Sequence, residues 1–229
     1  MEQIEILTTN EQVAELAEQL AAETTIAVDL EADSMHNYQE KVCLIQVSTL
    51  QRTVLIDPLA ATDLSPLKPI LADPAIRKIF HAADYDLRSL SRDFDLEVNG
   101  LFDTMICAQL LGEERIGLAD LLNKYFNVEL DKKYQKADWS LRPLKPAMIS
   151  YAAEDTHHLH RLAEILEQLW GYPPRRAADL RVVDVYVARL RGKLEPDPRN
   201  PELILTVRGT GYASQRVGEA ASAPMAAAG

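Results

Sequence analysis

A run of apolar residues, Ile26-Ala27-Val28, leads directly into two carboxylates, Asp29 and Glu31. The run predicts a strand over residues 25–30, and residues two apart on a strand point to the same face. Two like charges on a face that normally meets a core are costly unless a cation neutralises them. Taken alone, the pair is explained equally well by a strand that has run out into solvent.

Strand-like runs come early in the chain and are followed by helices that alternate with single strands. Strands are predicted over residues 4–7, 25–30, 42–47, 53–56, 77–80 and 101–102. One helix is predicted from a cap at Thr9 or Asn10 to about residue 23, and others over residues 64–71, 84–92, 104–111, 118–126 and 146–169. This order predicts an α/β fold with a mixed central sheet flanked by helices.

The composition, 47% hydrophobic and 26% charged in 229 residues, suffices for one good core plus an appendage. No apolar run reaches the roughly 18 residues that predict a transmembrane helix, and no secretory signal is visible. Cys43 and Cys107 lie in apolar runs and form no C-x-x-C pair. We therefore expect buried free thiols in a reducing cytoplasm.

The net charge of −11 is unevenly distributed along the chain. Residues 1–170 contain 15 Lys and Arg against 29 Asp and Glu, whereas residues 171–229 contain 9 against 6. An acidic domain can still act on phosphodiesters if bound metal cations supply the positive charge. The charge therefore weakly favours a metal-using enzyme over a passive nucleic-acid clamp.

Further carboxylates stand at two later positions that suit a shared site. Asp86 lies at a predicted helix start, and Tyr151 and Asp155 are spaced i, i+4 and so share a helix face. Alone, each is better explained as an ordinary helix residue. Together with Asp29 and Glu31 they predict a site for divalent cations, and two hard cations about 3.5–4 Å apart suit phosphodiester cleavage.

In order along the chain, these motifs resemble the tyrosine subclass of the DEDD exonucleases, ribonuclease D in particular, over residues 1–168. The resemblance is carried by residues 29–34 with 43–46, by residues 81–87, 102–104 and 108–111, by residues 130–144, and by Tyr151-Ala152-Ala153-Glu154-Asp155. The histidine subclass is excluded, because position 150 is Ser.

The resemblance implies a ribonuclease H-like fold and a 3′→5′ exonuclease that uses two Mg²⁺ or Mn²⁺ ions. Asp29 would bridge both metals, Glu31 and Asp155 would complete the nucleophile side, and Asp86 would complete the leaving-group side. Tyr151, with an expected pKa near 10, would orient the attacking water rather than act as a strong base. The expected substrate is single-stranded nucleic acid with a free 3′ end, and RNA is favoured although no residue separates it from DNA.

Other residues near these motifs are weaker candidates for nucleic-acid binding. Lys132, Lys133, Lys136 and Arg142 precede the last helix and suit phosphate contacts, although a solvated basic loop is an equally good explanation. His36 is a candidate for lining the strand channel. Base stacking is a candidate role for Tyr38, Tyr134 and Trp139, with core packing preferred for Trp139.

Three histidines, His157, His158 and His160, follow Asp155 closely. His157 and His160 suggest a ligand pair on one helix face. We expect all three to face outward instead, because no cysteine or third convergent ligand supports zinc.

The rest of the chain resembles part of the winged-helix domain of OmpR-like response regulators. Residues 181–194 resemble its recognition helix, and residues 195–201 and 203–212 its loop and wing hairpin. The remainder of that domain and the receiver are missing, so its recognition helix cannot be properly buried. The sequence thus predicts an exonuclease domain at 1–168, a partial winged-helix segment at 169–213 and a disordered Ala-rich tail at 214–229.

Three explanations of that segment stay open. In the first, the segment is a fusion remnant without function. In the second, it packs on the exonuclease domain and adds a weak basic contact through Arg189, Arg191, Lys193 and Arg208. In the third, it is half of a domain that a partner completes. We prefer the first. The rival functions are a DNA-binding transcription regulator and a catalytically silent nucleic-acid-binding module, and the five intact active-site positions argue against the second.

Overall fold

The structure is a computed structural model that describes residues 4–33, 40–170, 187–207 and 211–214. The chain divides into two compact units, Met1–Pro173 and Pro174–Gly229. No helix in the described ranges is long and apolar enough to cross a membrane. Cys43 and Cys107 are buried and free, as predicted.

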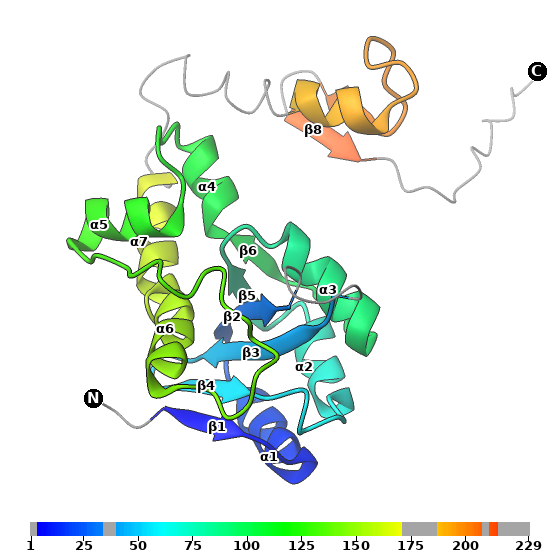
Figure 1. Cartoon of the computed structure of the whole chain (residues 1–229). Helices are drawn as coiled ribbons and strands as arrows, with labels where there is room; N and C mark the ends of the chain where they lie inside the picture. Colours follow the sequence, from blue (N-terminus) through cyan, green and yellow to red (C-terminus); the bar gives the residue numbers. More distant parts are fainter. Residues whose placement is uncertain (1–3, 34–39, 171–186, 208–210, 215–229) are drawn as a thin grey trace, which may run out of the picture. The chain divides into compact units, whose positions relative to one another are not determined.

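A six-stranded sheet forms the centre of the first unit, in the order β1-β4-β3-β2-β5-β6 (Figure 1). Its strands are β1 Glu5–Leu7, β2 Thr25–Ala32, β3 Val42–Ser48, β4 Thr53–Ile56, β5 Arg77–Phe80 and β6 Leu101–Asp103. The pairs β2–β3 and β3–β4 are antiparallel, whereas β1–β4, β2–β5 and β5–β6 are parallel. The prediction of an α/β fold with a mixed sheet is therefore confirmed.

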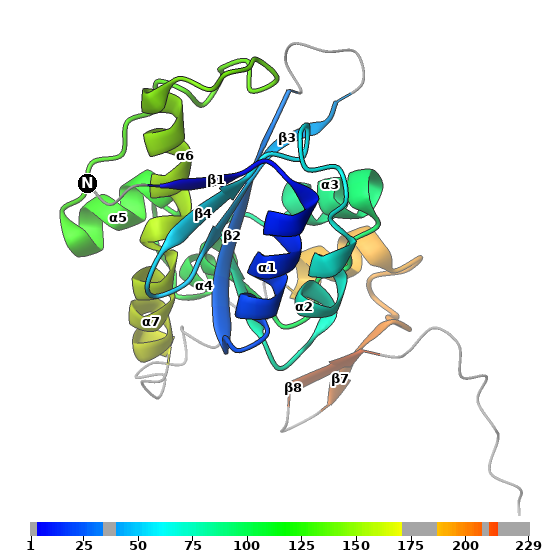
Figure 2. The ribbon, with the colours of Figure 1, turned by 90° about the horizontal axis from the view of Figure 1, so that it is seen from below.

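One face of this sheet carries the first helices (Figure 2). They are α1 Asn10–Leu20, the 3₁₀ turn η1 Ser65–Leu67, α2 Lys68–Ala72 and α3 Asp84–Phe94. Thr9 caps α1 through a capping box with Gln12. Ile26, Val28 and Leu30 of β2 belong to the hydrophobic cluster on this face.

The other face is covered by α4 Thr104–Leu110, α5 Leu118–Phe126, α6 Pro146–His157 and α7 Leu159–Trp170. Ala27 of β2 packs with α4, α5 and α7, and Leu44 and Leu55 pack with α6. Because side chains alternate along a strand, Asp29 and Glu31 share the face of Ala27. The carboxylates of β2 therefore lie on the side of the sheet that α6 covers.

The helix predicted over residues 146–169 is two helices that break at His158. Buried polar contacts lie on both sides of the break: the Thr156 hydroxyl bonds the Ser48 hydroxyl, and the His160 ring bonds the Ser48 carbonyl. The helix predicted over residues 64–71 is also split, into a 3₁₀ turn and α2, which begins at Lys68 and has Pro69 in its first turn.

The described part of the second unit holds a helical stretch at 187–194 and an antiparallel hairpin of β7 Ile204–Val207 with β8 Gly211–Ser214. The Glu195 carboxylate accepts from the backbone N–H groups of Glu202, Leu203 and Ile204, and Arg191 donates to the Ile204 carbonyl. These bonds tie the helical stretch to the hairpin. Residues 181–186 and 208–210 of the predicted segment lie outside the described residues, as does the Ala-rich tail beyond Ser214.

Candidate active site

The five residues predicted for catalysis come from three elements of the first unit. Asp29 and Glu31 lie on β2, Asp86 in the first turn of α3, and Tyr151 and Asp155 on α6. Asp86 is buried and the others are partly buried. A strand and two helix segments far apart in the sequence thus supply one group of acids.

The carboxylates of Asp86, Asp155 and Glu31 lie near enough to Asp29 to affect its pKa. Burial raises the pKa of Asp29 well above its ordinary value, and Asp86, Asp155 and Glu31 raise it further. Burial, with Asp155 and Asp86, raises the pKa of Glu31 to about 9. Burial raises the pKa of Asp86 and of Asp155 to about 7, with further contributions from Asp103 and Glu154 respectively. Four acids in this position are stabilised either by protons or by a bound cation.

The donor set is all carboxylate oxygen, which suits hard cations such as Mg²⁺ or Mn²⁺. In the side-chain arrangement present, no three His, Cys, Asp or Glu residues within the described ranges form a ready-made metal site. The donor chemistry of the four carboxylates nevertheless fits a metal centre for hard cations.

Tyr151 stands beside this group and packs in an aromatic cluster. Its ring lies 5.9 Å from that of Tyr134 and 6.1 Å from that of Trp139, measured between centroids. Burial raises the pKa of Tyr151 above its ordinary value, and the nearby Asp155, Glu31 and Asp29 raise it further. The hydroxyl is therefore protonated at neutral pH and available as a hydrogen-bond donor.

The turn that delivers Asp86 is held by a residue for which the sequence predicted no role. The Asp103 carboxylate accepts from the N–H groups of Ala82 (3.1 Å) and Ala83 (2.9 Å), just before α3. The same carboxylate caps α4 by accepting from Met105 and Ile106. Ala82 has a φ of +66°, a conformation that non-glycine residues rarely adopt. Asp103 therefore compensates local backbone strain beside the site.

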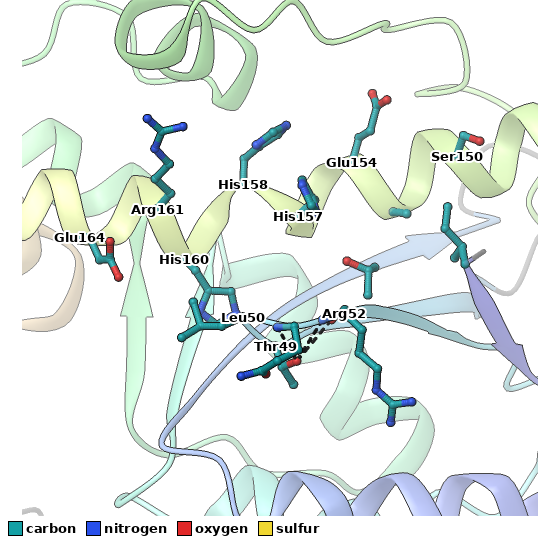
Figure 3. A pocket seen from close by; sticks show the side chains of 14 residues that line it. Thr49, Leu50, Arg52, Ser150, Glu154, His157, His158, His160, Arg161 and Glu164 are labelled. Atoms are coloured by element: carbon teal, nitrogen blue, oxygen red, sulfur yellow. Dashed lines mark hydrogen bonds between the residues drawn. The ribbon is translucent and has the colours of Figure 1, made fainter. Parts of the chain in front are cut away.

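The prediction that all three histidines face outward is wrong for His160. It is 6% exposed, and its Nε2 lies 2.9 Å from the Ser48 carbonyl oxygen. It follows Thr156 by one turn, so it continues the buried stripe of α6, a periodicity that would have identified it. His157 and His158 line a cavity of about 540 Å³ between the helices and residues 49–53 (Figure 3). Tyr151 and Asp155 are not among its lining residues.

The residues predicted to contact nucleic acid differ in their exposure. Lys132 and Lys133 are exposed, and the Lys133 ammonium lies 5.5 Å from the Tyr134 ring centroid. Trp139 is a core residue, 1% exposed, as preferred. His36 and Tyr38 lie outside the described residues.

Arg142 has a different role from the predicted phosphate contact. Its guanidinium makes two bonds to Asp57, at 2.5 and 2.7 Å, and donates to the carbonyls of Cys43, Trp139 and Leu141. These bonds join the segment before α6 to the sheet. The basic residue is therefore structural, because its donors are engaged inside the protein.

Residues 4–170 match the family described as 3′-5′ exonuclease. The chain belongs to this exonuclease family. The match contains all five of the predicted catalytic residues and both faces of the sheet.

Known members of the exonuclease family share both sequence and fold with the chain. Exosome complex component 10 of Mus musculus is 40% identical over 175 residues, which are 76% of this chain and 20% of that protein. The crystal structure of the catalytic core of RRP6 from Trypanosoma brucei matches with a TM-score of 0.70 and 39% identity, over 73% of this chain and 46% of that one. Escherichia coli RNase D, described as an exoribonuclease involved in structured RNA processing, gives a TM-score of 0.71 and 32% identity, over 82% and 50%. The chain thus spans about one fifth of the length of its curated relatives.

A second family, described as the C-terminal part of transcriptional regulatory proteins, matches residues 139–214. This match begins inside the exonuclease family match and includes α6 and α7 of the first unit. It covers a minor part of the chain and agrees with the winged-helix resemblance of the tail.

Proposed function

We propose that this chain removes nucleotides one at a time from the free 3′ end of single-stranded RNA, with divalent cations. The observation that carries the proposal is a group of four carboxylates, Asp29, Glu31, Asp86 and Asp155, inside a 3′-5′ exonuclease family domain; the other three raise the pKa of Asp29. RNA is preferred to DNA as substrate because the related RNase D is described as an exoribonuclease. The free buried thiols suit a cytoplasmic location.

Each catalytic group has a distinct task in this proposal. Asp29 would hold both cations, Glu31 and Asp155 would hold the cation on the nucleophile side, and Asp86 would hold the cation on the leaving-group side. When bound, Mg²⁺ or Mn²⁺ would supply Lewis-acid chemistry that lowers the pKa of the attacking water and neutralises charge on the leaving 3′-oxygen. The Tyr151 hydroxyl donates a hydrogen bond that orients the water.

The reaction is a hydrolysis at the last phosphodiester. The water oxygen forms a bond to phosphorus, the bond from phosphorus to the 3′-oxygen of the penultimate nucleotide breaks, and that oxygen takes up a proton. The terminal nucleotide leaves as a nucleoside 5′-monophosphate, and the shortened strand again has a free 3′ hydroxyl.

The test is a time course on 5′-labelled single-stranded RNA and DNA with Mg²⁺ or Mn²⁺. We expect a descending ladder that disappears with EDTA and falls at least about 100-fold in Asp86→Asn, since metal stabilisation amounts to several kcal/mol. Asp84→Asn is the matched control: it lies in the same helical turn, but its carboxylate is exposed and pairs only with Arg88 among the described residues.

Two outcomes would contradict the proposal. One is cleavage of a circular single strand, which has no 3′ end. The other is the absence of a ladder on both substrates from folded protein. The relative rates on RNA and DNA decide the substrate.

The second candidate function is duplex DNA binding through residues 174–214, which the match to transcriptional regulators favours. A gel-shift titration with mixed duplex sequences separates the two functions. Sequence-selective duplex binding without strand shortening would replace the nuclease with the regulator.

A further inference from the structure

The central strand β3 carries one buried residue whose polar atoms are unused. Gln46 is 0% exposed, and within the described ranges neither its Nε2 nor its Oε1 has a hydrogen-bond partner. Its neighbour two residues on, Ser48, is also buried but is bonded to Thr156 and Thr53. A buried primary amide without partners opposes folding, so its presence calls for a role beyond packing.

The surroundings of Gln46 do not need an amide. On one side its strand partner is Leu55 of β4, and Leu44 lies two residues before it on the same face. Both leucines are fully buried apolar residues under α6. An apolar side chain of similar volume would therefore fill the position of Gln46 without unpaired polar atoms.

On its other side Gln46 faces the site. Asp29 is its direct partner across the β2–β3 pair. Directly opposed residues on antiparallel strands point to the same face with Cβ atoms about 4.5–5.5 Å apart. The amide Nε2 of Gln46 is thus within side-chain reach of the Asp29 carboxylate. Glu31, the next acid along β2, is instead opposed by Leu44, which has no donor.

We propose that Gln46 is a positioning residue that donates an Nε2–H hydrogen bond to the ionised Asp29 carboxylate when cations are bound. The proposal rests on the proposed function of the site. In that state the Asp29 carboxylate would hold the cations, and a hydrogen-bond donor opposite it on β3 would favour one orientation of the carboxylate. Outer hydrogen-bond partners of metal ligands typically change metal affinity by about 10–100-fold.

The test compares Gln46→Met with Leu55→Met, a matched substitution at the adjacent buried position. Mn²⁺ alone is titrated calorimetrically into the full chain, and thermal unfolding is followed in EDTA. We expect Gln46→Met to weaken Mn²⁺ binding about 10-fold and to lower kcat by a similar factor, with KM for RNA changed less than about 3-fold. The metal-free melting temperature should stay the same or rise, because an unpaired amide has been removed.

Leu55→Met should leave Mn²⁺ affinity and kcat near those of the wild type. Equal Mn²⁺ affinity in Gln46→Met and wild type would overturn the proposal. So would a metal-free Gln46→Met protein that melts well below both other proteins, because the amide would then be a packing residue. If the wild type were inactive but its Mn²⁺ binding still depended on Gln46, the proposed nuclease function would be overturned and the positioning role of Gln46 would stand.

Discussion

Each carboxylate of the site holds its proton more tightly in the folded chain than an exposed acid does. The pKa of Glu31 is raised from 4.5 to about 9, mainly by burial. A group with a raised folded-state pKa contributes stability that is fully present below its unfolded pKa and is lost as the pH rises through the folded value. For Glu31 this contribution is complete below about pH 4.5 and gone above about pH 9.

We therefore expect the metal-free protein to lose thermal stability between pH 7 and pH 9. In Glu31→Gln the loss should be smaller by several degrees, since about 1 kcal/mol shifts the melting temperature of a chain this size by about 2–4 °C. Mg²⁺ should restore stability, and more so at pH 9. Calorimetry in EDTA and in Mg²⁺ measures both effects. In Asp84→Asn the metal-free melting temperature should fall with pH as steeply as in the wild type. An equally steep fall in Glu31→Gln would show that Glu31 is not the group responsible.

The role of a single residue could be predicted where it depends on local sequence spacing, and not where it depends on a partner distant in the sequence. The acids were found because their spacing and order are local features of the sequence. The role of Arg142 was missed because its partner Asp57 is 85 residues away. The burial of His160 follows from its helical spacing after Thr156, but its partner Ser48, 112 residues away, does not. Gln46 was visible only as part of a motif, since its partner across the strands depends on the register of β2 and β3.

The turn from β5 to α3 is the connection on which the placement of Asp86 depends. It contains Ala82 at positive φ and is held by Asp103, which also caps α4. Because Asp103 holds both this turn and the start of α4, its loss should affect activity as well as stability: Asp86 lies in the first turn of the helix that follows.

Asp103→Ala should cost about 1–2 kcal/mol of unfolding free energy and reduce activity about 10-fold or more, as the turn relaxes. Thr9→Ala removes the cap of α1 on the opposite face of the sheet and serves as the matched control. It should cost about the same stability with unchanged activity. Urea unfolding and the Mg²⁺ concentration for half-maximal rate measure the two effects. Equal activity losses in both variants would show that Asp103 acts only through stability.

Strands and helices with clear local signals were predicted nearly to the residue, such as β4, β5 and α5. The break at His158 was not, because no proline or glycine marks it. It coincides with contacts to Ser48 in a distant strand, which the helical periodicity cannot reveal.

The whole chain combines an acidic first unit with a second unit whose described residues fall within the match to transcriptional regulatory proteins. All five proposed catalytic residues and the three hydrophobic clusters belong to the first unit. The change of resemblance in the sequence predicts a domain boundary near residue 168, whereas the register of the sheet and the buried polar contacts needed coordinates.

A chain ending at Pro173 should fold and shorten RNA at the full-length rate within about 2-fold, because a unit with its own core folds alone. Circular dichroism tests the folding of the shortened chain and the ladder assay tests its activity. Asp29→Asn in the shortened chain is the inactive control. A shortened chain that folds but is inactive would show that residues 174–229 take part in catalysis.

The position of β2 in the sheet order has a further consequence for how the site comes apart. β2 is hydrogen-bonded to β3 on one side and to β5 on the other. Amides of such an inner strand exchange with solvent only when the entire sheet unfolds, whereas helices on its surface open at lower cost. Asp29 and Glu31 pair with β3 and lie just beyond residues 25–27, which pair with β5. We therefore expect the two acids to stay with the sheet, whereas Asp86 and Asp155 lie on helices that open earlier. Mild heat or denaturant should thus inactivate the enzyme by local opening of the helices that carry Asp86 and Asp155. The inactivation should be reversible, because the sheet that carries Asp29 and Glu31 stays folded.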